Sequence, residues 1–369
     1  MKNIIKYPAT LFFAIVIIGF SVLDIVYPLK TFSETENRML AQMPEFSLEK
    51  LFNGTFTSDF ETFTNDQFFA RDEWITLKSF SEMLLQKIIN NGIVYGKDNY
   101  LFDLTSTINE GQYQKNLSYL AEFSQMYADY NVSVGIIPNS TAILKEKLPL
   151  GFTGIDQLAL LNEIESVAKH SQIMDLVTPL QAHSQEYIFY KTDHHWTTLG
   201  AYYAYEQICN TLGMNAVSLN TLVGHEVKEF KGTYFAKAKK LNTDLDTITY
   251  YDFNSSTIKI GLDEYTSLYD ISKFEVYDKY SAFLYGNNGL TSIETPSSPN
   301  QKVLIIKDSY SNSLAPFLTE HYSTLDLVDL RQFTGSLSEL ITNGEYDDII
   351  FLFSVSNFVS EPNIAKLRY

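Results

Sequence analysis

Beyond residue 130, the hydrophobic pattern alternates between short, almost uninterrupted apolar runs and longer stretches with helical spacing. The short runs are typical of strands buried on both faces of a parallel sheet. They predict strands over residues 132–138, 172–177, 302–308, 324–330 and 347–355. The helical spacing predicts helices over residues 109–130, 154–171, 197–212 and 311–320. This alternation of strands and helices predicts a three-layer α/β fold with right-handed crossovers.

Three other regions depart from this alternation. Residues 33–46 are polar and irregular and are expected to be extended, whereas residues 223–293 carry short alternating runs that predict a small antiparallel β-rich insertion. Residues 47–89 have apolar side chains at three- and four-residue spacing, which predicts amphipathic helices whose aromatic stripe belongs to a core. The members of this stripe are Phe52, Phe56, Phe60, Phe63, Trp74, Leu77, Phe80 and Leu84.

The N-terminal segment has the pattern of a signal sequence. Lys2 and Lys6 precede an uncharged apolar run over residues 8–23, and Asp24 follows it. No clear cleavage site follows, so we expect residues 1–29 to be an uncleaved signal anchor with its N-terminus inside, and a cleaved signal peptide is the alternative. Residues 30–369 are then expected to form one extracytoplasmic domain that includes the insertion.

Charge and cysteine content exclude two classes of function. The 369-residue chain has a formal net charge of −17 and no basic stripe, which argues against a nucleic-acid partner. Its one cysteine, Cys209, excludes an intramolecular disulfide and a multi-cysteine zinc site. No cofactor and no metal are predicted.

Two short motifs carry candidate chemistry. Asp193, His194 and His195 stand together just before a predicted helix, and Ser309 follows the predicted strand 302–308. A serine nucleophile needs a histidine base and an orienting carboxylate, and residues two apart in an extended loop project to the same side, so Asp193 can hold His195.

Both motifs also have interpretations that do not involve a serine nucleophile. Asp308, Ser309 and Ser311 also fit a polar helix cap, and the 193–195 cluster also fits local hydrogen bonding or metal ligation. If a helix begins near Ser311, its dipole would lie close to the Ser309 hydroxyl.

The motifs TDHHWTTLGAYYAY, FLYGNNG and VLIIKDSYSNSLAPFL resemble those of the bacterial DHHW protein family. That family is similar to the SGNH-hydrolase-like alginate O-acetyltransferases, and the likeness covers most of the chain beyond Thr31. The resemblance implies an SGNH-like fold that is circularly permuted, because Asp193 and His195 precede Ser309 here.

By the same resemblance, Ser309 is the nucleophile, His195 the general base and Asp193 its orienter. His194 falls at the variable position and Trp196 follows as in the pattern, where we expect it to pack. The further oxyanion or substrate-binding candidates are Asn357, Asn139, Asn287 and Asp308. Lys307 departs from the pattern, since SGNH hydrolases have glycine at this position.

The function implied is an extracytoplasmic O-acetyltransferase that moves acetyl groups from a donor onto an exopolysaccharide or cell-wall glycan through an acetyl-serine. A polytopic membrane O-acyltransferase is the implied partner. A carbohydrate esterase with the same three residues, or a glycan-binding scaffold without catalysis, is the alternative.

Overall fold

The computed structural model describes residues 7–33, 38–103, 107–152, 154–254, 256–296 and 300–369. Lys2 and Lys6, which support the predicted orientation of the N-terminal anchor, lie outside these ranges. The chain divides into two compact units: Met1–Lys87 with Lys239–Asn242, and Ile88–Ala238 with Thr243–Tyr369.

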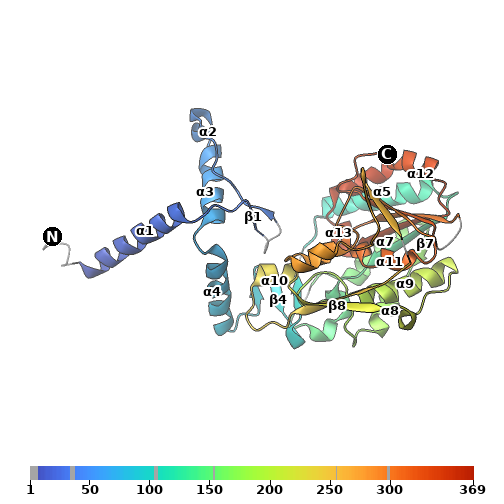
Figure 1. The fold of residues 1–369 in the computed structure, drawn as a ribbon, viewed down its shortest axis with the longest axis horizontal. Helices are drawn as coiled ribbons and strands as arrows, with labels where there is room; N and C mark the ends of the chain where they lie inside the picture. The colour runs from blue at the N-terminus through green and yellow to red at the C-terminus, as the bar shows by residue number, and fades with distance from the viewer. Residues whose placement is uncertain (1–6, 34–37, 104–106, 153, 255, 297–299) are drawn as a thin grey trace. The chain divides into compact units, whose positions relative to one another are not determined.

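The larger unit is built on an eight-stranded mixed sheet with the order β11-β10-β12-β14-β13-β15-β6-β7. The parallel pairs join β14, β13, β15, β6 and β7 in succession. Their bounds are Val132–Ile137 (β6), Gln172–Met174 (β7), Lys302–Lys307 (β13), Thr324–Asp329 (β14) and Asp348–Ser354 (β15). The predicted α/β fold with a mainly parallel sheet is therefore confirmed (Figure 1).

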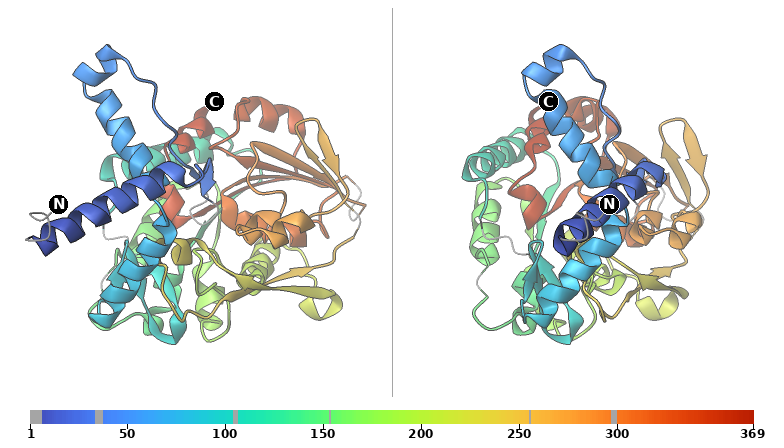
Figure 2. Two further views of the ribbon diagram at one scale, coloured as in Figure 1. Left: turned by 60° about the vertical axis from the view of Figure 1, so that its left-hand side comes forward. Right: turned by 90° about the vertical axis from the view of Figure 1, so that its left-hand side faces the viewer.

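Successive side chains of the central strands enter two separate hydrophobic clusters, as the two-residue period of a strand requires. Ile305 of β13 packs with helix α9, whereas its neighbours Leu304 and Ile306 pack with helices α5, α7 and α12. Figure 2 shows the sheet lying between these helical layers. The helices of this unit are α5 (Glu110–Met126), α6 (Ser140–Ile143), α7 (Gln157–Val167), α8 (Val177–Ala182), α9 (Thr198–Leu212), α10 (Thr233–Ala238), α11 (Ala315–Leu318), α12 (Leu337–Gly344) and α13 (Val355–Phe358).

The β-rich region splits into two parts. Strands β8 (Gly224–Phe230) and β9 (Asp246–Tyr251) form an antiparallel ribbon of their own. Strands β10 (Thr257–Ile260), β11 (Asp263–Tyr265) and β12 (Leu290–Glu294) instead extend the main sheet, because β12 pairs antiparallel with β14. A separate three-stranded sheet contains β3 (Ile89–Asn90), β4 (Ile93–Tyr95) and β5 (Leu101–Asp103).

The helix expected over residues 311–320 does not form as predicted. The structure has a short 3₁₀ helix, η7 (Ser309–Asn312), and then the four-residue α11. Pro316 lacks an N–H, and Ser and Asn side chains compete for backbone hydrogen bonds, so a regular helix cannot extend through this segment. A helix dipole aimed at Ser309 is therefore not part of the site. The strand predicted over 172–177 also ends earlier, since Val177 begins α8.

The smaller unit is helical, with α1 (Pro8–Val26), α2 (Leu48–Phe52), α3 (Thr55–Gln67) and α4 (Arg71–Leu84), and it has two short paired strands, β1 (Phe32–Ser33) and β2 (Arg38–Met39). Among the described residues, α1 is the helix that is long and apolar enough to cross a membrane.

The expectation that the aromatic stripe of α2 to α4 is core is wrong for most of its members. Phe52 is 85% exposed, Leu84 66% and Trp74 44%, while Ser79 on the opposite side of α4 is 2% exposed. Helical spacing identifies an apolar face, but it does not say what covers that face.

Candidate active site

Ser309 lies directly after the central strand β13, at the carboxyl edge of the parallel strands. Asp308 caps the turn that follows: its Oδ1 accepts from the Tyr310 amide at 3.0 Å. Its Oδ2 accepts from the amide and hydroxyl of Ser354, at 2.8 and 2.7 Å. Asp308 thereby ties the serine turn to the end of β15.

The loop that carries the histidines is held at both ends. After it, the Thr197 hydroxyl accepts from the Gly200 amide at 3.3 Å and caps α9. Before it, the buried carboxylate of Asp246 on β9 accepts from the Lys191 and Thr192 amides, each at 2.8 Å, and from the Thr192 hydroxyl at 2.5 Å. Burial raises the pKa of Asp246, and the hydrogen bonds from these donors offset that rise only in part.

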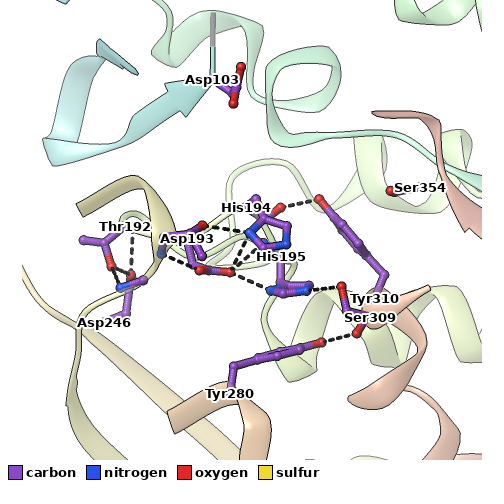
Figure 3. Close-up of polar contacts among 12 residues, drawn as sticks. Asp103, Thr192, Asp193, His194, His195, Asp246, Tyr280, Ser309, Tyr310 and Ser354 are labelled. Carbon is purple, nitrogen blue, oxygen red and sulfur yellow. Dashed lines mark hydrogen bonds and ion pairs between the residues drawn. The ribbon is translucent and has the colours of Figure 1, made fainter. Parts of the chain in front are cut away.

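Asp193, His195 and Ser309 form a continuous hydrogen-bonded series (Figure 3). Nδ1 of His195 lies 2.6 Å from Oδ1 of Asp193, and its Nε2 lies 2.8 Å from Oγ of Ser309. All three are buried; Ser309 is 8% exposed. With the proton on Nδ1, Nε2 is free to accept the serine proton, so the arrangement is chemically competent for a serine nucleophile.

The carboxylate of Asp193 remains ionised in this setting. Burial raises its pKa, but the charges of His194 and His195, together with hydrogen bonds from His195 and the Thr233 amide, outweigh burial and hold the pKa well below its usual range. Thr233 N donates to Oδ2 at 2.7 Å, and His195 N donates to Oδ1 at 3.0 Å. These donors fix the carboxylate toward the imidazole.

Gly232 makes this approach possible. A Cβ at Gly232 would lie 2.2 Å from Cβ of Asp193, a distance that no side chain tolerates. Gly232 N also donates to the Thr192 hydroxyl at 3.0 Å. The segment before α10 can therefore contact the histidine loop only with glycine here.

Tyr280 packs flat against His195. The two ring centroids are 3.8 Å apart and the planes differ by 11°. The Tyr280 hydroxyl lies 3.0 Å from the carbonyl oxygen of Ser309, to which it donates, and 3.1 Å from the Ser313 hydroxyl. One residue thus touches both the imidazole and the backbone of the serine (Figure 3).

His194 turns away from the serine. Its Nδ1 lies 2.8 Å from the Thr233 hydroxyl, and the Tyr310 hydroxyl donates to its carbonyl oxygen. Burial, and then the charge of His195, lowers the pKa of His194 to about 4. Trp196 is 0% exposed and donates to the Tyr310 carbonyl at 3.0 Å, so it packs inside the protein, as expected.

The three asparagine candidates lie in different settings. Asn357 of α13 donates one side-chain hydrogen to Asp308 Oδ2 at 2.8 Å, which leaves its second N–H for another acceptor. Asn139 follows β6, and its Oδ1 accepts from Ser356 at 3.5 Å. Asn287 is engaged elsewhere, because its Oδ1 accepts from Lys307 at 3.2 Å and from Asn312 at 3.1 Å.

Lys307, which occupies the position where SGNH hydrolases have glycine, donates from Nζ to Asn287 Oδ1 at 3.2 Å. Its Nζ also donates to Asn312 Oδ1 at 2.6 Å. Burial lowers the pKa of Lys307 to about 8, although Asp329 partly opposes the shift. The lysine therefore links the side chains of Asn287 and Asn312.

Metal binding is an alternative use of the 193–195 cluster, whose ligand atoms all lie within 4.8 Å of one another. Both nitrogens of His195, however, face hydrogen-bond partners, Asp193 and Ser309, and Nδ1 of His194 faces Thr233. An ion would have to displace one of these bonds. The donor set fits proton transfer better than metal coordination.

Sequence patterns do not single out three residues that support this site: Tyr280, Asp246 and Gly232. All three belong to the 223–293 region, which the sequence describes only as β-rich. They have no periodic or motif signal, since each contact joins positions far apart along the chain.

Comparison with solved structures finds similar folds. A DHHW family protein from Eubacterium siraeum is 25% identical, with a TM-score of 0.67 over 76% of this chain and 96% of that chain. Bacillus cereus PatB1 is 20% identical, with a TM-score of 0.60 over 73% of this chain and 98% of that chain. The O-acetyltransferase domain of Pseudomonas putida AlgJ is matched more weakly, at 16% identity and a TM-score of 0.47, over 75% of this chain and 98% of that chain.

A search of curated proteins finds no match. The sequence model of the DHHW protein family matches residues 159–328. This range contains the Asp193–Trp196 motif and the strand and turn that carry Ser309. The resemblance to the DHHW proteins that these motifs predict is therefore confirmed.

Proposed function

We propose that this protein is an extracytoplasmic O-acyltransferase that moves acetyl groups onto hydroxyls of an exopolysaccharide or cell-wall glycan. The observation that carries the proposal is the series Asp193–His195–Ser309, with separations of 2.6 and 2.8 Å. A distance near 3 Å between nucleophile and base is what acyl transfer requires. The resemblance of its motifs to those of the SGNH-hydrolase-like alginate O-acetyltransferases supports the same reaction class.

In the first half-reaction, His195 Nε2 takes the Ser309 proton as Oγ attacks the acetyl carbonyl carbon. The tetrahedral intermediate collapses when the bond to the donor's leaving oxygen breaks, and His195 returns the proton to that oxygen. The Ser309 amide and the free N–H of Asn357 are our candidates for stabilising the oxyanion. An acetyl-serine and the deacylated donor result.

In the second half-reaction, a glycan hydroxyl attacks the acetyl carbon while His195 accepts its proton. The ester bond to Ser309 Oγ breaks, and His195 protonates the departing serine. Asp193 stabilises the imidazolium in both halves.

Helix α1 supports a location at the extracytoplasmic surface of the membrane. We propose that it remains as an uncleaved anchor, which would hold the site close to an acetyl donor supplied through the membrane by a polytopic O-acyltransferase.

The test is direct acetylation of the purified full chain by p-nitrophenyl acetate, with and without a candidate glycan. Intact-protein and peptide mass spectrometry are expected to find one acetyl group on Ser309 in the wild type and none in Ser309→Ala. Equal turnover by both proteins would refute the assignment. Free acetate as the product at every glycan concentration would identify an esterase instead.

A further inference from the structure

We propose that helix α4 lies in the lipid headgroup region beside the anchor, with its exposed apolar face against the bilayer. The proposal rests on the anchored location proposed above, and it concerns residues outside the active site. The face consists of Trp74, Leu77, Phe80 and Leu84.

On α4 the apolar side is exposed and the polar Ser79 is buried, which is the reverse of an ordinary surface helix. Leu77 is 53% exposed and Leu84 66%, whereas Ser79 is 2% exposed. Spacings of three and four residues place the four apolar side chains on one side of the helix. An exposed apolar face of this kind marks an interaction surface.

Contacts with α1 place this face at a defined depth. Phe20 of α1 contacts Trp74, with ring centroids 5.7 Å apart, and it stacks on Phe68 at 5.9 Å. One turn further along α1, Asp24 Oδ1 accepts from the Phe69 amide at 2.7 Å. The junction between α3 and α4 is therefore attached to the last turns of the candidate span.

Asp24 sets the level of the membrane surface, because a carboxylate is costly inside hydrocarbon. Phe20 precedes it by four residues, which at the helical rise of 1.5 Å per residue is about 6 Å deeper. Trp74, in contact with Phe20, then reaches the depth of about 5–10 Å at which interfacial helices bury their apolar faces. Tryptophan is also the residue most typical of this zone.

The direction of α4 agrees with this placement. Figure 1 draws α4 running across the direction of α1, so that a helix that spans the bilayer leaves α4 lying along its surface. Glu73 and Lys78 are also exposed on α4. Both are long enough to keep their charges among the headgroups.

The experiment uses the full chain in phosphatidylcholine vesicles and exploits its two tryptophans. Trp196 is fully buried, so bromine-labelled lipids report on Trp74. Lipids brominated near the headgroup end of the acyl chain are expected to quench Trp74 emission more than lipids brominated near the chain terminus. Trp74→Phe is expected to abolish the quenching.

A second pair of variants tests the face itself. Leu77→Glu with Leu84→Glu is expected to leave the protein resistant to carbonate extraction, because α1 is intact, but to shift Trp74 emission to the red and remove its quenching. Lys78→Gln, on the same helix, is the matched control and is expected to behave as wild type.

Two outcomes would overturn the proposal, and they are distinguishable. Release of the wild type by carbonate would refute the anchored location on which it rests. Retention in the vesicles with Trp74 unquenched would refute the interfacial helix alone, and would leave the face to a protein partner.

Discussion

Tyr280 offers a sharp test of how the site is held together. Its ring covers one face of His195, and its hydroxyl donates to the Ser309 carbonyl at 3.0 Å. Tyr280→Phe keeps the stacked ring but removes the donor, and Tyr280→Leu removes both. The difference between the variants separates the two roles.

The expected magnitudes follow from these contacts. A buried carbonyl that loses its donor costs about 1–3 kcal/mol, so Tyr280→Phe should lower stability by about that amount. Loss of the ring contact adds about 0.5–1.5 kcal/mol. If the contact mainly orients the imidazole, Tyr280→Leu should lower kcat roughly tenfold beyond Tyr280→Phe, because about 1.4 kcal/mol corresponds to a factor of ten.

The assay is steady-state turnover of p-nitrophenyl acetate, with the folded fraction of each variant measured by urea unfolding. We expect the loss in kcat, with KM nearly unchanged, because Tyr280 contacts the base and the serine backbone. The matched control is Tyr346→Phe, which removes a tyrosine hydroxyl that donates at 2.5 Å to Asp326, outside the triad. Our reasoning is refuted if folded Tyr280→Leu retains the kcat of Tyr280→Phe.

Three further predictions address other parts of the site. Asp193→Asn should lower the rate of Ser309 acetylation about 10³–10⁴-fold, because an amide donor favours the wrong tautomer of His195; stopped-flow measurement showing less than a tenfold loss would contradict this role. Asn357→Ala should lower kcat by about 10²–10³-fold if its N–H stabilises the oxyanion, whereas an unchanged kcat would remove it from that role. Lys307 has a folded-state pKa lowered from 10.5 to about 8. Between these pH values the unfolded chain binds more protons than the folded chain, so the free energy of unfolding should rise with pH, by up to about 3 kcal/mol. Urea unfolding of Lys307→Met should lack this rise, and equal pH slopes for the two proteins would count against the prediction.

The parallel strands and the proximity of Asp193, His195 and Ser309 could be predicted because their signals are local. Buried strands give continuous apolar runs, and Asp193 and His195 are two positions apart in one motif. The position of Ser309 after a strand also follows from the pattern. These features depend on neighbours in the sequence, which a hydrophobic period or a motif reports well.

The remaining parts depend on contacts between distant segments. Asp246 lies 54 positions from Thr192, whose hydroxyl it holds, and no pattern links the two. The sequence predicts the exposed face of α4 as core, because periodicity shows which side of a helix is apolar but not whether protein, lipid or water surrounds that side. The helix after Ser309 is shorter than the apolar spacing predicts, because Pro316 lacks an N–H.

The strand order has a consequence for when the protein becomes reactive. Strand β15 lies between β13 and β6, yet among the described strands it comes latest in the chain. Its Ser354, and Asn357 just beyond, supply the donors that fix Asp308 next to Ser309. During synthesis, β13 therefore has no neighbour on that side until residues beyond 350 emerge. If Ser309 is the nucleophile proposed above, no shorter nascent chain holds it in the arrangement described here.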